Sequence, residues 1–77
     1  MRFRLTQQAE KQYRKAPADI RRAFDKQVLL LAENSRHPSL DAKRYKDTYQ
    51  GRITLSWRFY FDIDGDAYVI HAITKHL

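Results

Sequence analysis

The last third of the sequence, residues 51–77, most constrains the fold. It holds three runs rich in β-branched and aromatic residues, which are typical of strands. The runs are residues 52–55, 57–61 and 67–74. An Asp64-Gly65 pair separates the last two runs and favours a tight hairpin turn, because glycine adopts positive φ without steric cost. We therefore predict a small sheet onto which the rest of the chain folds.

The first half of the sequence predicts a strand followed by two helices. Residues 2–5 alternate polar and apolar side chains, as a short strand does. Thr6 is suited to cap a helix over residues 7–15, because its hydroxyl can accept from a free N–H of the first turn. Residues 17–34 repeat apolar side chains at i, i+3 and i+4, and only Gln27 interrupts the apolar stripe.

Residues 35–46 are predicted to form a basic loop, with Leu40 and Tyr45 as its anchors to the core. The full order of elements predicts an α+β fold of the type β-α-α-β-β-β. In this fold the N-terminal strand and a two-helix hairpin pack on a small, mainly antiparallel sheet. We expect one domain over residues 1–77.

Composition points to a polyanionic partner. Fifteen Lys and Arg residues stand against nine acidic residues, giving a net charge of +6. Such a charge on so small a chain favours nucleic acid or an acidic protein as partner, although a merely soluble basic domain has the same composition. The absence of cysteine excludes disulfides and cysteine-based zinc sites.

Other classes of protein lack their sequence signals here. There is no apolar run of about 20 residues for a membrane span and no apolar core of a signal peptide, so we expect a cytoplasmic protein. We find no glycine-rich phosphate loop and no zinc-protease motif. We therefore expect neither a cofactor nor a metal.

Polar residues alternate with apolar ones in the middle predicted strand. Arg58 and Tyr60 should therefore face away from the helices, and Arg52 has the parity to extend this polar face. A guanidinium on a rigid strand can clamp a phosphate, and a histidine such as His76 can move protons near neutral pH. These residues are the predicted centre of a functional site.

The register of the last hairpin remains open from sequence. A two-residue turn at 64–65 places Arg58 level with His71, whereas a three-residue loop at 64–66 shifts the pairing by one residue. Only the second register gives His76 the parity of Arg58. The sequence therefore leaves two arrangements of the arginine and the terminal histidine.

Each of these residues also has a plainer structural interpretation. Tyr60 could be an aromatic side chain that covers the sheet, and Arg58 could pair with Asp62. His71 lies in an apolar run, which favours a packed, hydrogen-bonded histidine over a catalytic one. The basic residues of the predicted loop could be solvated surface.

Four segments together resemble the RelE/ParE superfamily, the toxins of bacterial toxin–antitoxin pairs. They are the helical hairpin after the first strand, the Arg36–Leu40 segment with the lysines that follow it, residues 57–66, and a last strand that ends in His76. This resemblance covers almost the whole chain. It implies a sheet backed by a helical hairpin, with a concave basic face.

The resemblance also implies an activity and a set of site residues. RelE-type toxins enter the ribosomal A site and cleave mRNA without a metal, by attack of a ribose 2′-OH on the adjacent phosphate. By position, Arg58 would stabilise the charge of the phosphorane and His76 would be the general acid or base. Arg52 and Tyr60 would line the site. The implied nucleic-acid-binding residues are Lys43, Arg44, Lys46 and Lys75.

The partners implied by the resemblance are a cognate antitoxin, the ribosome and mRNA, and a toxin–antitoxin hetero-oligomer is expected. Two alternatives share the same fold. One is a ParE-like inhibitor of DNA gyrase that does not hydrolyse RNA. The other is a catalytically silent module that binds RNA or an antitoxin.

Overall fold

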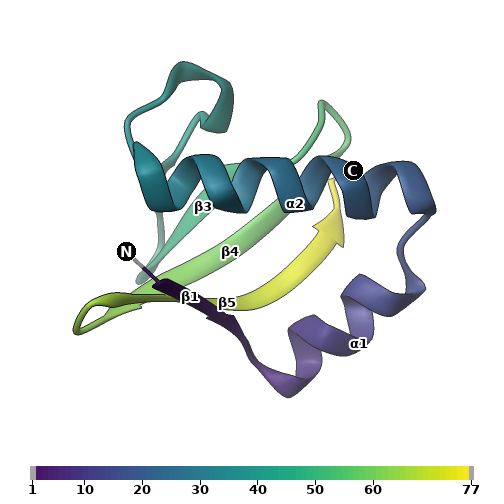
Figure 1. Cartoon of the computed structure of the whole chain (residues 1–77), viewed down its shortest axis with the longest axis horizontal. Helices are drawn as coiled ribbons and strands as arrows, with labels where there is room; N and C mark the ends of the chain where they lie inside the picture. The colour runs from purple at the N-terminus through teal and green to yellow at the C-terminus, as the bar shows by residue number, and fades with distance from the viewer. Residues whose placement is uncertain (1, 77) are drawn as a thin grey trace.

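The computed structural model describes residues 2–76, which form one five-stranded sheet and two α-helices. The strand order is β1-β5-β4-β3-β2, and only the β1–β5 pair is parallel. Helix α2 crosses one face of the sheet, and α1 lies beside β5 (Figure 1). The predicted α+β architecture is confirmed. The elements are β1 (Arg2–Leu5), α1 (Gln7–Lys15), α2 (Ala18–Glu33), a 3-10 turn (Pro38–Leu40), β2 (Lys43–Tyr45), β3 (Thr48–Arg52), β4 (Trp57–Asp64) and β5 (Ala67–Lys75).

Local sequence signals set the bounds of both helices. The Thr6 hydroxyl accepts from the Ala9 backbone N–H at 3.2 Å, so the predicted cap of α1 is confirmed. Pro17 separates the helices, because it cannot donate a backbone hydrogen bond, and α2 begins one residue later. Within residues 2–76 no helix is long and apolar enough to cross a membrane.

The core lies between α2 and the sheet. Phe24 of α2 packs edge-to-face on Phe59 of β4, with ring centroids 5.7 Å apart. Val28 and Leu31 extend the same helical stripe, and Leu40 seals the end of the core with no exposed surface. Burial of such side chains stabilises the fold by about 1.5–3 kcal/mol each. Leu40 is thus the anchor that the sequence predicted.

Gln27, the polar residue that interrupts the apolar stripe of α2, connects the helix to two other segments by hydrogen bonds. Gln27 is 6% exposed, and its amide nitrogen donates to the backbone carbonyls of Ser39 at 3.1 Å and Arg52 at 2.9 Å. Buried carbonyls that lack a partner are costly, so these two bonds stabilise the loop and the end of β3. The helix is therefore joined directly to the strand that carries Arg52.

Two predictions about strands were wrong. The predicted strand at residues 52–55 is instead β3 at Thr48–Arg52, followed by a turn over residues 53–56. The chain must reverse there because Arg52 pairs with Arg58 across an antiparallel ladder, so the β propensity of the 52–55 run is overridden. In addition, the predicted basic loop contains β2. Tyr45 at its end is 44% exposed and is not a core anchor.

The hairpin between β4 and β5 has a two-residue turn. Asp64 pairs with Ala67, so Gly65 and Asp66 form the turn, one residue later than the predicted turn at 64–65. Gly65 has a φ of 62°, a left-handed conformation that glycine adopts without strain. The predicted hairpin is confirmed, and its turn differs from both registers considered above.

A β-bulge in β5 shifts the register beyond the turn. His71 is the extra residue, because the pairing slips between Tyr60 and Phe61 of β4. The slip brings Arg58 level with Thr74. His76 lies one residue beyond β5, but its backbone N–H donates to the Ser56 carbonyl and so extends the pairing with β4, which keeps His76 on the parity of Thr74 and Arg58. The bulge thus gives the terminal histidine the parity that the longer loop would have given.

Two of the glutamines of α1 occupy the edge of β5 where β1 has ended. The Gln12 side-chain oxygen accepts from the Ile73 backbone N–H at 2.7 Å. The Gln8 amide nitrogen donates to the His71 backbone carbonyl at 3.3 Å. Side chains of a helix thereby satisfy ladder groups that a neighbouring strand would otherwise pair.

Candidate functional site

The candidate site lies on the face of the sheet opposite α2, which we call the outer face. Gly51 fixes the two faces, because a Cβ built on it would lie 2.4 Å from the buried Phe59 ring. Residue 51 therefore faces the core, and its neighbours face outward. The outer face of β2 to β5 carries Lys43, Tyr45, Thr48, Gln50, Arg52, Arg58, Tyr60, Asp62, His71 and Thr74.

Arg52 and Arg58 lie directly opposite each other on β3 and β4. Like charges in such cross-strand pairs repel and destabilise a sheet unless other groups compensate them. Both guanidiniums have compensating partners, which are described below. The strand pairing thus places the two arginines on one face of the sheet, as predicted.

Arg58 is tied to the turn between β3 and β4. Its Nη1 donates to the backbone carbonyls of Thr54 at 2.6 Å, Leu55 at 3.1 Å and Trp57 at 3.1 Å. Within residues 2–76, Nε and Nη2 make no hydrogen bond, and the predicted alternative of an ion pair with Asp62 does not occur. One nitrogen of the guanidinium is therefore structural, and the other two remain available to a ligand.

Arg52 faces a carboxylate. Its Nη2 donates to Asp41 Oδ2 at 3.1 Å, and Lys43 Nζ lies 3.6 Å from the same oxygen. Asp41 adopts a left-handed conformation, with φ of 46°, at the end of the 3-10 turn. Arg52 Nε is the one buried side-chain nitrogen or oxygen without a partner in the described part of the chain. The Asp41 carboxylate thus lies against both Arg52 and Lys43, and Arg52 Nε still lacks a hydrogen-bond partner within residues 2–76.

His76 lies at the same end of the sheet as the arginines. Its backbone N–H donates to the Ser56 carbonyl in the β3–β4 turn, which fixes the chain just beyond β5. The side chain is exposed and forms no hydrogen bond or ion pair with residues 2–76. The imidazole is thus free to contact a ligand.

Two of the predicted nucleic-acid-binding residues do not share the outer face. Lys75 lies opposite Trp57, on the side of the sheet that carries the core. Arg44 lies over the Tyr49 ring, 5.3 Å from its centroid, and its Nη1 donates to the Tyr49 hydroxyl at 3.3 Å. Lys43 remains on the outer face, because it pairs with Gln50.

Two tyrosines cover part of the outer face. The rings of Tyr45 on β2 and Tyr60 on β4 lie 5.5 Å apart, tilted by 51°. Lys46 Nζ lies 5.5 Å from the centre of the Tyr45 ring. Tyr60 is half-buried, as the structural interpretation of an aromatic cover predicts. The exposed Tyr45 also leaves an aromatic surface open to solvent.

A polar network centres on the bulge residue His71. Its Nε2 lies 2.9 Å from Thr48 Oγ1 and 3.3 Å from Asp62 Oδ2. Thr48 Oγ1 donates to the Phe61 carbonyl at 2.8 Å, so it can only accept from the imidazole. Nε2 therefore carries the hydrogen. The predicted hydrogen-bonded histidine is confirmed, and sequence missed its partners because they depend on the bulge.

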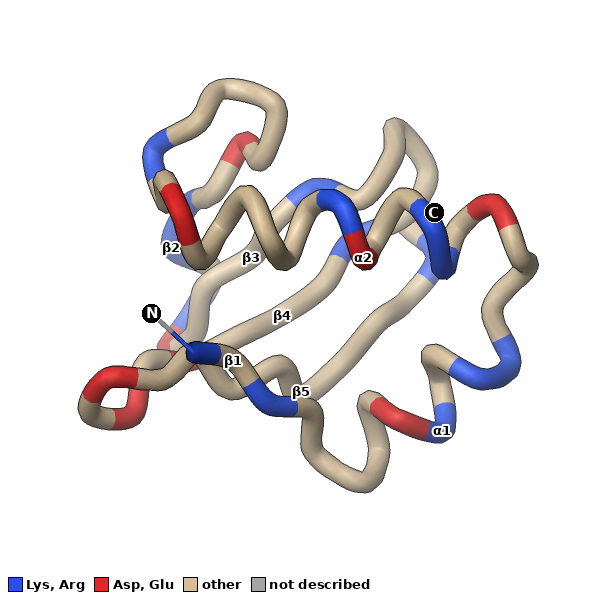
Figure 2. The backbone as a smooth tube through the Cα atoms, viewed as in Figure 1, with Lys and Arg blue, Asp and Glu red and all other residues tan. Residues whose placement is uncertain are grey.

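Charge is distributed unevenly along the strands. Figure 2 shows acidic residues at the β4–β5 turn. Basic residues lie at β2 and at the ends of β3 and β4 that are farthest from this turn. Asp66 and Asp64 at the turn face Arg2 at 3.2 Å and Arg4 at 3.8 Å. These pairs balance the acidic end. The excess positive charge on the sheet thus lies at the end with Arg52 and Arg58.

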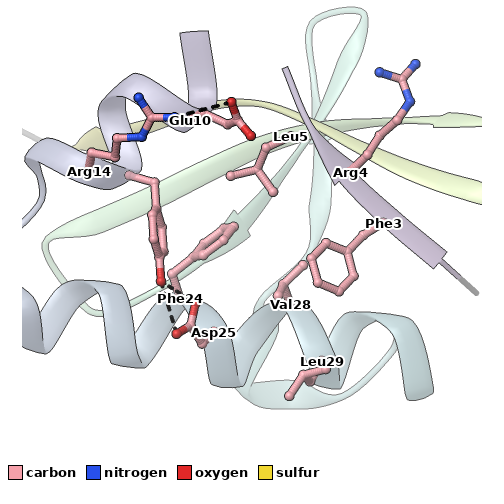
Figure 3. Close-up of a pocket in the computed structure, with 10 residues that line it drawn as sticks. Phe3, Arg4, Leu5, Glu10, Arg14, Phe24, Asp25, Val28 and Leu29 are labelled. Carbon is pink, nitrogen blue, oxygen red and sulfur yellow. Dashed lines mark hydrogen bonds and ion pairs between the residues drawn. The ribbon is translucent and has the colours of Figure 1, made fainter. Parts of the chain in front are cut away.

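A separate groove of about 670 Å³ opens between β1 and the two helices (Figure 3). Its walls are mostly apolar, and its charged groups have partners: Arg14 pairs with Glu10 at 3.8 Å, and Arg4 pairs with Asp64 outside the groove. The Tyr13 hydroxyl donates to Asp25 at 2.9 Å, and this bond raises the pKa of Tyr13. The groove can hold apolar side chains, but it lacks the free polar groups that catalysis needs.

Comparisons with known proteins identify the fold. No model of a known protein family matches the sequence, and no curated protein matches it. Among solved structures, the chain is similar to a YoeB/ParE toxin from Agrobacterium tumefaciens, with 14% identity over 100% of both chains and a TM-score of 0.83. It is also similar to a chain of a RelB–RelE antitoxin–toxin complex from Methanococcus jannaschii, with 19% identity over 92% of this chain and 87% of that one and a TM-score of 0.75. A YoeB dimer from Staphylococcus aureus has 14% identity over 100% and 98% of the two chains and a TM-score of 0.82.

Proposed function

We propose that this chain, which has the fold of the RelE/ParE toxins, is the toxin of a toxin–antitoxin pair and cleaves mRNA on the ribosome. The observation that carries the proposal is the cationic end of the outer face. Two arginines lie opposite each other there, unpaired guanidinium nitrogens remain, and an exposed histidine follows on the same parity. No helix covers this face in the described residues.

The proposed reaction is transfer of an RNA phosphate from the 5′-oxygen of one nucleotide to the 2′-oxygen of the preceding one. As the 2′-oxygen attacks, negative charge develops on the phosphorane. Arg52 and the free nitrogens of Arg58 donate to these oxygens and stabilise the transition state. His76 acts either as the general base that takes the proton of the 2′-hydroxyl or as the general acid that protonates the departing 5′-oxygen, and solvent exchanges the other proton; imidazole suits either role near neutral pH. The 2′,3′-cyclic phosphate and a 5′-hydroxyl are the products.

RNA binding on this face rests on phosphate contacts. Lys43 lies on the outer face and shares the Asp41 carboxylate with Arg52, and Lys46 lies against the exposed Tyr45 ring. Contacts of this kind release counterions, so affinity should fall steeply with salt. The binding roles predicted for Arg44 and Lys75 would need RNA to reach around the edge of the sheet.

An antitoxin is the proposed protein partner. Solved relatives of this fold occur with RelB and with YefM antitoxins. The net charge of +6 favours an acidic segment that covers the cationic end and blocks RNA. The proposed assembly is therefore a toxin–antitoxin hetero-oligomer that is inactive until the antitoxin leaves.

Translation in a cell-free extract, with primer extension on the mRNA, tests this function. The wild type should produce cuts in the ribosomal A site, and His76→Ala should slow them by about 10²–10⁴-fold. The imidazole has no partner within residues 2–76, so this variant should keep its melting temperature. Lys11→Ala, an exposed change on α1, is the control and should cut normally.

Two outcomes would contradict the ribonuclease. Full-speed cutting by His76→Ala would remove the proposed acid–base role. A wild-type protein that leaves mRNA intact but inhibits DNA supercoiling would instead establish the gyrase alternative. Neither effect, combined with tight antitoxin binding, would establish the silent binding module.

A further inference from the structure

Gln50 is a buried polar residue on the outer face that has no protein partner. It is 7% exposed, although it points away from the hydrophobic core. Its side-chain amide forms no hydrogen bond within residues 2–76. Because Arg52 Nε is the one fully buried polar atom without a partner in this part of the chain, the amide of Gln50 still reaches solvent. The amide is therefore held in a largely buried side chain, but its donor and acceptor remain available to a ligand.

The tyrosine pair lies beside Gln50 on the outer face. Tyr45 on β2 and Tyr60 on β4 are separated by β3, so their backbones lie about 9–10 Å apart. Their ring centroids are 5.5 Å apart, which requires the rings to lean toward each other over β3. Gln50 lies on β3 between the two strands, level with Tyr60 on one side and Lys43 on the other. A largely buried glutamine without a partner in the described residues therefore neighbours a partly exposed pair of aromatic side chains on the same face.

This combination of groups matches a nucleobase. Aromatic rings stack on the faces of bases, whatever the base. A glutamine amide offers one donor and one acceptor in a plane, which can pair with the edge of a base and fits adenine bidentately. Lys43 and Lys46 lie close enough to the rings to contact the phosphates on either side.

We propose that Gln50, Tyr45 and Tyr60 form a base-selective subsite, in which one base of the bound RNA stacks on the tyrosines and is read by the Gln50 amide. This inference rests on the proposed RNA-binding function and adds the residue that sets sequence preference. Adenine is the expected base. In this subsite the donor and the acceptor of the Gln50 amide, which have no partner within residues 2–76, form hydrogen bonds with the base.

Binding of short RNAs tests the subsite without relying on cleavage. Fluorescence anisotropy at low salt would compare heptanucleotides of adenylate, cytidylate and uridylate. The wild type should bind the adenylate heptanucleotide about tenfold more tightly than the other two, the typical size of one good bidentate contact, and a preference for cytidylate or uridylate would contradict the proposed reading of the base by Gln50. Gln50→Met keeps the length of the side chain but removes donor and acceptor. It should bind all three RNAs within about twofold of one another.

Stability distinguishes a binding role from a structural one. Replacing an unpaired amide with an apolar side chain of similar shape is neutral or stabilising. The melting temperature of Gln50→Met should therefore not fall while its selectivity is lost. Tyr45→Ala should weaken all three RNAs alike, by about fivefold or more, because stacking is independent of sequence. Gln7→Met, an exposed change on α1, should keep the wild-type preference.

The results separate this inference from the proposed function. RNA binding without base preference, or a preference that survives in Gln50→Met, would overturn the subsite and leave the ribonuclease proposal standing. Base-selective binding that depends on Gln50, in a protein that leaves mRNA intact in the extract, would support the subsite and reject the nuclease. A lower melting temperature for Gln50→Met would show that the amide is structural.

Discussion

Asp41 should weaken RNA binding, because its carboxylate lies against Arg52 and Lys43 and would repel a phosphate held by Arg52. Asp41→Asn removes the charge but keeps an oxygen that can accept from Arg52. Asparagine also tolerates the left-handed conformation at this position. The variant therefore changes electrostatics with little change of shape.

The expected gain follows from Coulomb's law. A phosphate held by Arg52 would lie about 6 Å from the carboxylate, where repulsion at a dielectric constant of about 80 is about 0.7 kcal/mol. Asp41→Asn should therefore bind a short RNA about threefold more tightly at low salt. The gain should shrink at about 1 M salt, where the screening length falls to about 3 Å.

Anisotropy titrations at two salt concentrations measure this effect. Asp19→Asn is the matched control, because it makes the same change in net charge on α2. It should gain much less affinity than Asp41→Asn. Equal or weaker binding by Asp41→Asn would refute the reasoning and show that the carboxylate orients Arg52 for RNA instead of competing with it.

Three further predictions concern the fold and are measured by chemical or pH denaturation. Gln27→Leu should destabilise by about 1–3 kcal/mol, since it leaves two carbonyls unpaired, and an unchanged urea midpoint would contradict this. Gly51→Ala should cost about 1–3 kcal/mol, because its Cβ would overlap the buried Phe59 ring, and a stable variant would mean that the ring can move. The hydrogen bond to Asp25 raises the pKa of Tyr13 in the folded protein. The contribution of this bond to the free energy of unfolding is therefore present below the ordinary tyrosine pKa and is lost as pH rises through the raised pKa. Tyr13→Phe should abolish this alkaline loss, and an unchanged pH profile would contradict that assignment.

Sequence patterns predicted those parts of the fold that depend on neighbouring residues. The periodic apolar positions of α1 and α2 and the Thr6 cap are local signals, and the helix bounds agree to within one residue. The strand at residues 52–55 could not be placed correctly, because its β propensity carries no information on where the chain must reverse. The three-residue β2 was missed because its charged sequence resembles a loop.

The candidate site was predictable only to the level of strand parity. Alternation placed Arg58 and Tyr60 on the outer face, and the structure pairs Arg58 with Arg52 as that parity required. The roles of Asp41 and Gln50 depend on a left-handed turn residue and on rings that lean across a strand. No sequence pattern reports either feature. Recognising β2 would, however, have shown that adjacent basic residues on it face opposite ways.

The glutamines of α1 determine where another chain could extend this sheet. Gln8 and Gln12 occupy the backbone groups of β5 beyond the end of β1, so a foreign strand cannot pair there without displacing the helix. Another strand could therefore be added only at the free edges of β1 and β2, the two edge strands of the sheet. Both flanks are short and carry arginine or lysine, which discourages self-association between identical basic molecules. An acidic extended peptide would meet no such electrostatic barrier.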